Sequence, residues 1–257
     1  LFKNPKTKMK KVNKIKIVKF GGKSMANGKG LEHVLSIIRE KVRQEEKFAV
    51  VASARGNATD ELLEILELAK TGGDYTDKLE AFKKYQIEPD LSIDLEAEFS
   101  LLKKLYDGVN LLGDYSSKIR DRVIAQGELL AVKMLAGLLQ KEGIAAQPVD
   151  SRKLIKTDGS FGEAIPIQKV SKENVIRHFK KNDHELQIVT GFIASNLEDE
   201  TTTLGRNGSN YSASLIANYL DAEELENYTH VNGIYTANPD LVADAQMIEE
   251  LTFQEAN

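Results

Sequence analysis

The chain has 257 residues, of which 41% are hydrophobic and 29% are charged, with a formal net charge of −4. This length predicts one large α/β domain or two lobes, and no apolar run comes near the length of a membrane span, which favours a soluble protein without a membrane partner. The sequence contains no cysteine, which excludes disulfides and thiolate metal sites and is compatible with a cytoplasmic location.

The N-terminal end is basic. Residues 1–16 contain seven lysines and no acidic residue, so the rest of the chain is acidic overall. A lysine-rich end can bind polyanions, but such ends are more often solvated. We therefore interpret residues 1–14 as a basic N-terminal arm and expect no nucleic-acid partner.

Hydrophobic patterning predicts alternating strands and helices. The alternating residues from Ile15 to Phe20 predict a strand that Gly21-Gly22 ends, and a helix over 31–43 and a strand over 48–52 complete a βαβ unit. Further periodicity predicts helices within 60–107, over 114–142 and from an N-cap at Ser171 to about Lys180, and strands over 144–149, 187–193 and 201–204. The fold class is therefore α/β, with an open, mainly parallel sheet sandwiched by helices.

Small polar residues follow the first two strands, at the sheet edge where open α/β sheets bind ligands. Lys19 lies near the end of the first strand, just before two glycines. It is either an exposed lysine at a strand edge or a fixed cation that reaches phosphates over a glycine turn. The segment lacks the GxxxxGK[ST] pattern, so it is not a P-loop.

Gly127 and Glu128 interrupt the longest helical pattern. An interior glycine costs a helix about 1 kcal/mol relative to alanine, so Gly127 indicates close approach by another backbone or by a ligand. Glu128 is then either an ordinary solvated glutamate or a carboxylate that awaits an ammonium group.

A glycine loop over 203–213 lies between a predicted strand and a predicted helix, which is the usual construction of an anion site. Gly205 and Gly208 let the backbone approach a ligand, Arg206 offers two donors to a carboxylate, and Ser209 adds a hydroxyl. The alternative is a hydrophilic surface turn with a chance arginine.

The last part alternates strand and loop. Tyr235 is either a residue that stacks on a base or an ordinary core residue. His230 and Asp240 are too few ligands for a metal site, so we predict none.

Six separated segments, in order, resemble the amino acid kinase family and, within it, the aspartokinases, most closely the kinase domains fused to homoserine dehydrogenase. They are Lys19-Phe20-Gly21-Gly22 with Ser24, Ser53-Ala54 with Thr59, Gly127-Glu128, Thr157-Asp158 with Phe161-Gly162, Gly205 to Ala213, and Thr229 to Pro239. The resemblance implies the amino acid kinase fold over 15–257, with an amino-acid-binding lobe over 15–196 and the start of a nucleotide-binding lobe over 197–257.

The resemblance also implies a reaction: transfer of the γ-phosphoryl of MgATP to the side-chain carboxylate of L-aspartate, in threonine, methionine and lysine biosynthesis. It implies a full-length homo-oligomer, further regulatory domains, and a Mg²⁺ held mainly by the nucleotide. No covalent intermediate is needed, because a carboxylate is already nucleophilic at pH 7.

Residue roles carry over from the same motifs. In the amino-acid site Arg206 would clamp the α-carboxylate and Glu128 would bind the ammonium group. The phosphoryl group would be held by Lys19 and by the N–H groups of the following glycines. The remaining implied residues are Ser53, Thr59 and Ser209 for aspartate, Gly21, Gly22, Ser24, Thr229, His230, Tyr235 and Asp240 for the nucleotide, and Asn210 and Lys23 for catalysis.

The sequence departs from the family at five positions. Lys23 stands where the family has threonine, Asn210, His230 and Asn238 where it has aspartates, and Asp240 where it has an arginine. Asn210 keeps an acceptor but loses a negative charge. Three functions follow as alternatives: a rewired active kinase, an aspartate- or nucleotide-binding pseudokinase, and a kinase for another small carboxylate or carbamate.

Overall fold

The computed structural model describes residues 14–26, 28–87, 93–229, 233–237, 239 and 241–252. Most of the predicted basic arm, residues 1–13, lies outside the described residues. So do three predicted site or motif positions, His230, Asn238 and Asp240.

A five-stranded parallel sheet forms the centre of the molecule, in the order β3-β4-β2-β1-β7. Its strands are β1 (Lys16–Phe20), β2 (Phe48–Ala52), β3 (Ala146–Val149), β4 (Leu186–Thr190) and β7 (Glu224–Tyr228). Every residue of β2 is buried, as expected for the middle of a parallel sheet covered on both faces. The predicted βαβ unit is confirmed.

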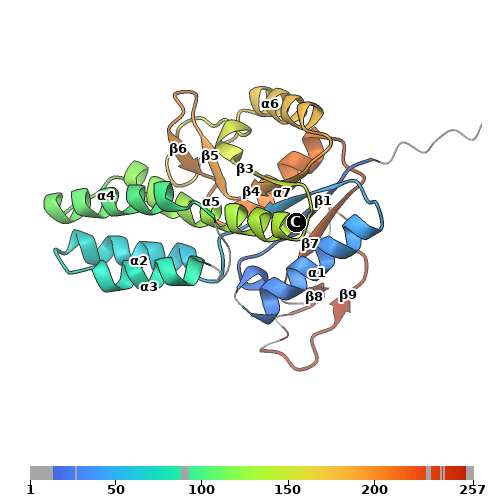
Figure 1. The fold of residues 1–257 in the computed structure, drawn as a ribbon. Helices are drawn as coiled ribbons and strands as arrows, with labels where there is room; N and C mark the ends of the chain where they lie inside the picture. Colours follow the sequence, from blue (N-terminus) through green and yellow to red (C-terminus); the bar gives the residue numbers. More distant parts are fainter. Residues whose placement is uncertain are drawn as a thin grey trace, which may run out of the picture.

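Helices cover both faces of this sheet (Figure 1). One face packs against α1 (Lys29–Arg43) and α5 (Ser117–Lys141), and the other against α6 (Gln168–Lys181) and α7 (Gly208–Tyr219). Successive side chains of a strand point to opposite faces, so Val18 faces α1 and α5 while Ile17 faces α6 and α7. Lys19 has the parity of Ile17 and therefore points to the face that α7 covers.

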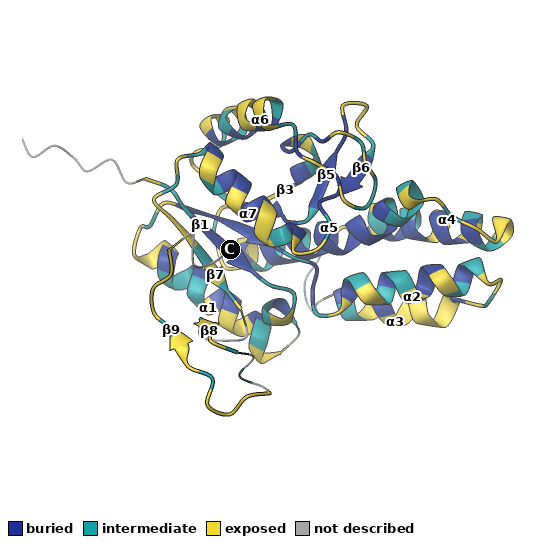
Figure 2. Cartoon of the chain, turned by 180° about the vertical axis from the view of Figure 1, so that it is seen from behind, coloured by how far each residue is buried: buried dark blue, intermediate teal, exposed yellow. Residues whose placement is uncertain are grey.

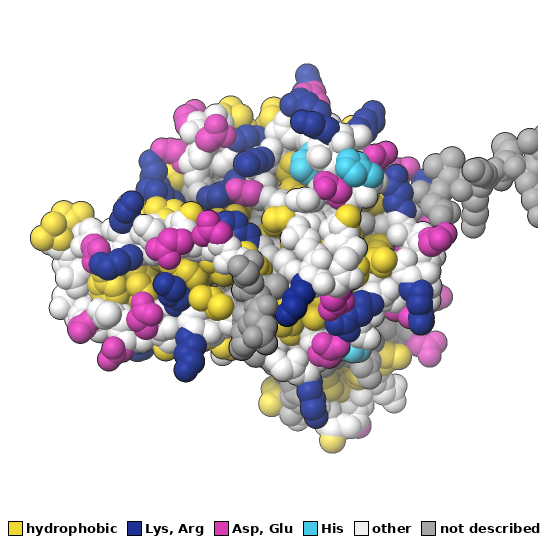
Figure 3. Space-filling model, in the orientation of Figure 1, with side chains coloured by type: hydrophobic (Ala, Val, Ile, Leu, Met, Phe, Trp, Pro, Cys, Tyr) yellow, Lys and Arg dark blue, Asp and Glu magenta, His cyan; other side chains and the backbone are white. Residues whose placement is uncertain are grey.

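Three helices form an arm that projects from the sheet, at the left of Figure 1. They are α2 (Ala58–Lys70), α3 (Thr76–Gln86) and α4 (Glu96–Leu112), and they share a separate apolar core with part of α5. The helices predicted within 60–107 are thereby confirmed. Hydrophobic side chains lie exposed at the far end of the arm (Figure 3), where Leu111 and Leu112 end α4.

Helix α5 joins the arm to the sheet and is the most buried helix (Figure 2). By length and composition it could cross a membrane, so the expectation that no apolar run comes near that length is wrong, but 78% of its most apolar stretch is buried inside the fold. Its composition is therefore that of a core helix. Gly127 lies on it where an added Cβ would be 2.9 Å from Ala54 Cβ, which confirms the predicted close approach.

Short elements connect the layers. Two antiparallel hairpins pair β5 (Ile193–Ser195) with β6 (Thr201–Thr203) and β8 (Ile234–Tyr235) with β9 (Met247–Ile248), and two 3₁₀ turns, η1 (Lys23–Met25) and η2 (Ser151–Lys153), follow β1 and β3. The single strand predicted over 187–193 is wrong. The chain turns at Gly191 and at Phe192, whose φ is +64°, so β4 ends and β5 begins a different sheet.

The N-cap predicted at Ser171 is also wrong. Helix α6 begins at Gln168, and Ser171 lies buried in its first turn. The Ser171 hydroxyl accepts from the Lys156 N–H at 3.0 Å and donates to the Lys156 carbonyl at 3.2 Å. The serine thus satisfies the backbone of a neighbouring loop instead of its own helix, which a pattern within the helix cannot reveal.

Two helical glycines give a matched stability test. Nothing lies within 4 Å of a Cβ added at Gly108 on α4, whereas one added at Gly127 would meet Ala54. Gly108→Ala should therefore raise the free energy of unfolding by roughly 0.5–1 kcal/mol through helix propensity. Gly127→Ala should lower it, because α5 must move from its neighbour. Urea denaturation of both variants checks this, and a stabilising Gly127→Ala would contradict the close contact.

Candidate functional site

A cavity of about 310 Å³ lies where β1 and β2 end, which is the edge of a parallel sheet where ligands bind. Residues from several elements line it: Lys19, Gly21, Gly22, Ser53, Ala54, Gly56, Thr59, Glu128, Phe192, Gly205, Asn207, Gly208, Ser209 and Asn210. Eight of the predicted site residues are in this set. Sequence segments up to about 190 residues apart thus meet around one space.

The two loops after β1 and β2 pack backbone against backbone. The Gly56 N–H donates to the Gly22 carbonyl at 2.9 Å, and a Cβ added at Gly22 would lie only 2.7 Å from the Ala54 carbonyl oxygen. Any side chain at position 22 would therefore push the loops apart. Gly56 adopts a φ of +56°, which a glycine adopts without strain.

Lys19 is a buried cation at this cavity. Its strand is flanked by β2 and β7, and only 8% of the residue is exposed, so the alternative of an exposed lysine at a strand edge is wrong. Among the described residues its ammonium group has no hydrogen-bond or ion-pair partner, and it lies 3.5 Å from a Cβ added at Gly21. Burial lowers the pKa of Lys19, because the charged form loses hydration.

Glu128 brings a buried carboxyl group to the same cavity. The residue is 2% exposed, so the alternative of a solvated glutamate is wrong. The Ala54 N–H donates to Oε1 at 3.3 Å, while the buried Oε2 has no partner among the described residues. Burial raises the pKa of Glu128 to about 8. A cation that entered the cavity would give Oε2 its missing partner and favour the ionised form.

The N-terminus of α7 also opens into the cavity. Asn207 precedes this helix in a left-handed conformation, with a φ of +59°, and no side chain caps the helix. Unpaired N–H groups in a first turn, together with the helix dipole, attract anions. Ser209 packs against Gly191, where a Cβ would lie 2.7 Å from the serine Oγ. The cavity thus combines one carboxyl group with two features that bind anions.

Some predicted residues do not line this cavity. Arg206 is exposed on the loop between β6 and α7, next to lining residues on both sides. Lys23 is exposed and Ser24 half-buried in η1. Thr229 is exposed after β7, and Tyr235 is half-buried in the hairpin of β8 with β9. Their roles stay predictions.

Other lining residues had no predicted role, although Ala54 and Asn207 lie in segments that the sequence singles out. Ala54 contributes a main-chain N–H, and Phe192 and Asn207 contribute strained backbone with positive φ. Every residue except proline has a main-chain N–H, so residue type does not predict which one faces the cavity. Asn207 does have a detectable signal, because asparagine tolerates the left-handed region better than most residues.

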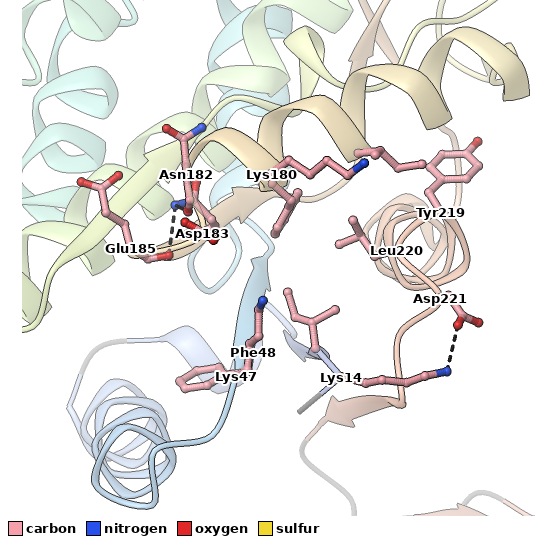
Figure 4. Close-up of a pocket in the computed structure, with 14 residues that line it drawn as sticks. Lys14, Lys47, Phe48, Lys180, Asn182, Asp183, Glu185, Tyr219, Leu220 and Asp221 are labelled. Atoms are coloured by element: carbon pink, nitrogen blue, oxygen red, sulfur yellow. Dashed lines mark hydrogen bonds and ion pairs between the residues drawn. The ribbon is translucent and has the colours of Figure 1, made fainter. Parts of the chain in front are cut away.

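A larger cavity of about 540 Å³ lies at the opposite edge, where the strands begin (Figure 4). It is lined by Phe48, Tyr219 and Leu220, with Lys47 and Lys180 reaching into the space. Both α6 and α7 end there, so the negative ends of their dipoles oppose an anion that the lysines would attract. Size alone does not make it the functional site, and the smaller cavity has the coherent chemistry.

A sequence model of the amino acid kinase family matches residues 14–257. The chain belongs to the amino acid kinase family. This amino acid kinase is 30% identical to the bifunctional aspartokinase/homoserine dehydrogenase of Buchnera aphidicola subsp. Acyrthosiphon pisum, over 94% of this chain and 31% of that protein. It is 29% identical to the lysine-sensitive aspartokinase 3 of Escherichia coli K12, over 95% of this chain and 55% of that protein. The chain therefore spans about a third to a half of these relatives.

Solved structures agree with this kinase fold. The crystal structure of E. coli aspartokinase III in complex with aspartate and ADP has a TM-score of 0.82 at 29% identity, over 91% of this chain and 53% of that one. The isopentenyl phosphate kinase structure, at 15% identity and a TM-score of 0.55, shares the fold alone. The predicted resemblance to aspartokinases and the predicted α/β fold are both confirmed.

The buried carboxyl group of Glu128, whose Oε2 has no partner among the described residues, predicts a stability that depends on pH. The unfolded carboxyl loses its proton near pH 4.5 and the folded one near pH 8, so the native state binds more protons between these values. Stability should therefore fall as pH rises through this window, by at most about 1.4 kcal/mol per pH unit. Glu128→Gln should remove this slope and exceed the wild type in stability at pH 8.

Denaturant titrations from pH 5 to pH 9 measure this slope. Glu80→Gln, at an exposed position of α3, is the matched control and should keep the slope of the wild type. Equal slopes in the wild type and in Glu128→Gln would show that Glu128 titrates normally.

Proposed function

We propose that this amino acid kinase acts on L-aspartate, transferring the γ-phosphoryl of MgATP to the side-chain carboxylate to give 4-phospho-L-aspartate. The observation that carries this proposal is that Glu128 Oε2 and the Lys19 ammonium group, at one cavity, have no partner in the described part of the chain. The ammonium group of the substrate would pair with Glu128, and the transferred phosphoryl group would pair with Lys19. The aspartate and ADP bound to E. coli aspartokinase III, a relative, support the same pair of ligands.

The amino-acid end of the cavity suits an α-amino acid. Glu128 would accept from the substrate ammonium group, and the N-terminus of α7 with Ser209 would bind a carboxylate. Ser53 and Thr59 line the same space and offer hydroxyl groups. Arg206 lies between the lining residues Gly205 and Asn207 but does not line the cavity. Its side chain would reach the α-carboxylate by turning toward the cavity. These assignments favour aspartate over a carboxylate or carbamate that lacks an ammonium group.

The phosphoryl end is built on β1 and the glycines that follow it. A side-chain oxygen of aspartate forms a bond to the γ-phosphorus while the bond from that phosphorus to the bridging oxygen of ADP breaks, and ADP carries away the electron pair. Lys19 would neutralise charge on the phosphoryl oxygens, and Gly21 and Gly22 line the same space. The Gly22 N–H would donate to the phosphoryl group, and the Gly21 N–H, which donates to the Tyr228 carbonyl at 3.4 Å, would have to leave that acceptor to do the same. In this proposal Mg²⁺ enters with the nucleotide, and Ser24, Thr229, Tyr235, His230 and Asp240 belong to the nucleotide side.

A pseudokinase is the second candidate, because Asn210 lines the cavity where the family carries an aspartate. In the active kinase, which stays the first candidate, Lys23 of η1 would supply a cation on the phosphate side to offset Asp240, which stands where the family has an arginine. We also propose three properties that the family resemblance implies. They are a division into lobes between residues 196 and 197, a homo-oligomer of the full-length protein, and a role in threonine, methionine and lysine biosynthesis.

Trapping of the acyl phosphate with hydroxylamine, together with ADP release, tests the proposal on the chain. Aspartate-dependent product is expected, and a folded protein without it would favour the pseudokinase. Lys19→Ala should lower turnover by roughly 10²-fold or more, because one preorganised charge is lost at the transition state. Aspartate affinity should change little.

Lys29→Ala provides the matched control, since Lys29 is an exposed lysine at the start of α1. It should leave turnover unchanged. If Lys19→Ala keeps the wild-type rate, Lys19 has no part in phosphoryl transfer.

Asn210→Asp tests the departure from the family. Restoring the carboxylate should raise turnover or leave it unchanged, because an added negative charge can orient a lysine near the phosphoryl group. A large fall in turnover would show instead that Asn210 and Lys23 work as a matched pair. Single-turnover measurements with saturating aspartate separate this effect from substrate binding.

A further inference from the structure

Asp121 is a fully buried carboxylate that the proposed reaction does not use. It lies on α5, with no exposed surface, and its partners belong to other elements. Oδ2 accepts from the Gly162 N–H at 2.8 Å and from the Thr203 N–H at 3.0 Å, and Oδ1 accepts from the Thr203 hydroxyl at 3.0 Å. Arg120 Nη1 lies 3.8 Å from Asp121 Oδ1. The carboxylate therefore fastens α5 to β6 and to the loop that contains Gly162.

Both ends of the amino-acid site depend on the elements that Asp121 joins. Glu128 lies seven residues later on α5, which is two helical turns or about 10 Å along the same side. Thr203 ends β6, and the chain then continues through the glycine loop into α7, whose N-terminus opens into the cavity. Thr203 is thus fixed directly before this loop, together with Leu204, whose N–H donates to the Phe192 carbonyl at 2.9 Å.

The hydrogen bonds that join Asp121 to Thr203 and Gly162 are part of a larger set with a specific geometry. The Thr203 hydroxyl also lies 3.2 Å from the Gly162 carbonyl, and the Thr203 carbonyl accepts from the Ala164 N–H at 2.8 Å. Burial raises the pKa of Asp121, while the hydrogen bonds from Gly162 and Thr203 lower it. A buried carboxylate with three donors from outside its helix holds their positions to within a narrow range, because the Gly162 and Thr203 N–H groups would otherwise be left unsatisfied.

We propose that Asp121 is a positioning residue that sets the separation between Glu128 and the N-terminus of α7, and through it the length of amino acid that the cavity accepts. The inference rests on the proposed function, because it takes Glu128 to bind the ammonium group, Arg206 to bind the α-carboxylate, and the N-terminus of α7 to bind the side-chain carboxylate. A fixed separation selects aspartate over glutamate, which is longer by one methylene. Loss of the attachment lets α7 move relative to α5 and relaxes this selection.

Asp121→Ala should weaken aspartate binding by roughly tenfold or more, since it leaves buried donors unsatisfied beside the site. The ratio of glutamate to aspartate dissociation constants should fall at the same time, as measured by calorimetric titration. Hydrogen exchange should become faster at the amides of 205–210. Exchange tests the positioning itself and needs no ligand, so its result is independent of the proposed function.

Asp121→Asn should restore most of the affinity, the selectivity and the protection. Its amide oxygen can accept from both N–H groups, and its NH₂ can donate to the Thr203 hydroxyl, which still has the Gly162 carbonyl as acceptor. Thr203→Val removes one hydrogen bond in a nearly isosteric side chain, so it should shift the same three quantities in the direction of Asp121→Ala by a smaller amount. This variant carries the test if Asp121→Ala does not fold.

Tyr106→Phe is the control for a general loss of stability. Tyr106 is buried in the arm, and its hydroxyl donates to the Leu62 carbonyl at 3.1 Å. The variant should lower the melting temperature without changing exchange at 205–210 or the selectivity.

Unchanged exchange at 205–210 in both Asp121→Ala and Thr203→Val would overturn the positioning role, whatever the protein binds. Faster exchange with wild-type selectivity for aspartate would overturn the role in selecting substrate length. A wild type that binds neither amino acid would refute the proposed function and the selectivity with it.

Discussion

The contact between the loops after β1 and β2 is the constraint on which the site depends. Because Gly22 lies against the Ala54 carbonyl with no room for a side chain, the loops meet at the carboxyl edge of the sheet. The same close packing continues to Gly127, which lets α5 approach Ala54. Lys19 from one strand and Glu128 from a helix more than a hundred residues later therefore face one cavity.

Sequence patterns predicted those parts of the fold that local physical chemistry determines. The first strand, the helix after it and the strand over 48–52 follow from periodicity, and the structure confirms all three. Lys19 and Glu128 can be singled out from the sequence because Lys19 comes shortly before two glycines that end a strand and Glu128 follows a glycine inside a helix. The resemblance to the family then chose between the alternatives that the residues alone left open.

Other features depend on contacts that no local pattern encodes. Asp121 has the sequence signature of a solvated acid near a helix start, yet its partner Thr203 lies 82 residues away and makes it a buried attachment. Ser171 looked like a cap, but its hydroxyl binds a neighbouring loop. The turn at Phe192 requires a positive φ in a run of apolar residues that otherwise predicts one strand.

The charges of the cavity explain why such attachments are needed. Lys19 and Glu128 ionise to opposite charges and line one space, but they do not form an ion pair, and burial shifts the pKa of each toward its neutral form. A pair between them would stabilise the empty protein and close the site. The sheet and α5 hold them apart at a cost in folding free energy, because among the described residues the Lys19 ammonium group and Glu128 Oε2 have no partner. A ligand that supplies both missing charges recovers this cost on binding. Because the surrounding elements are rigid, a ligand of matching length binds more tightly than one of a different length.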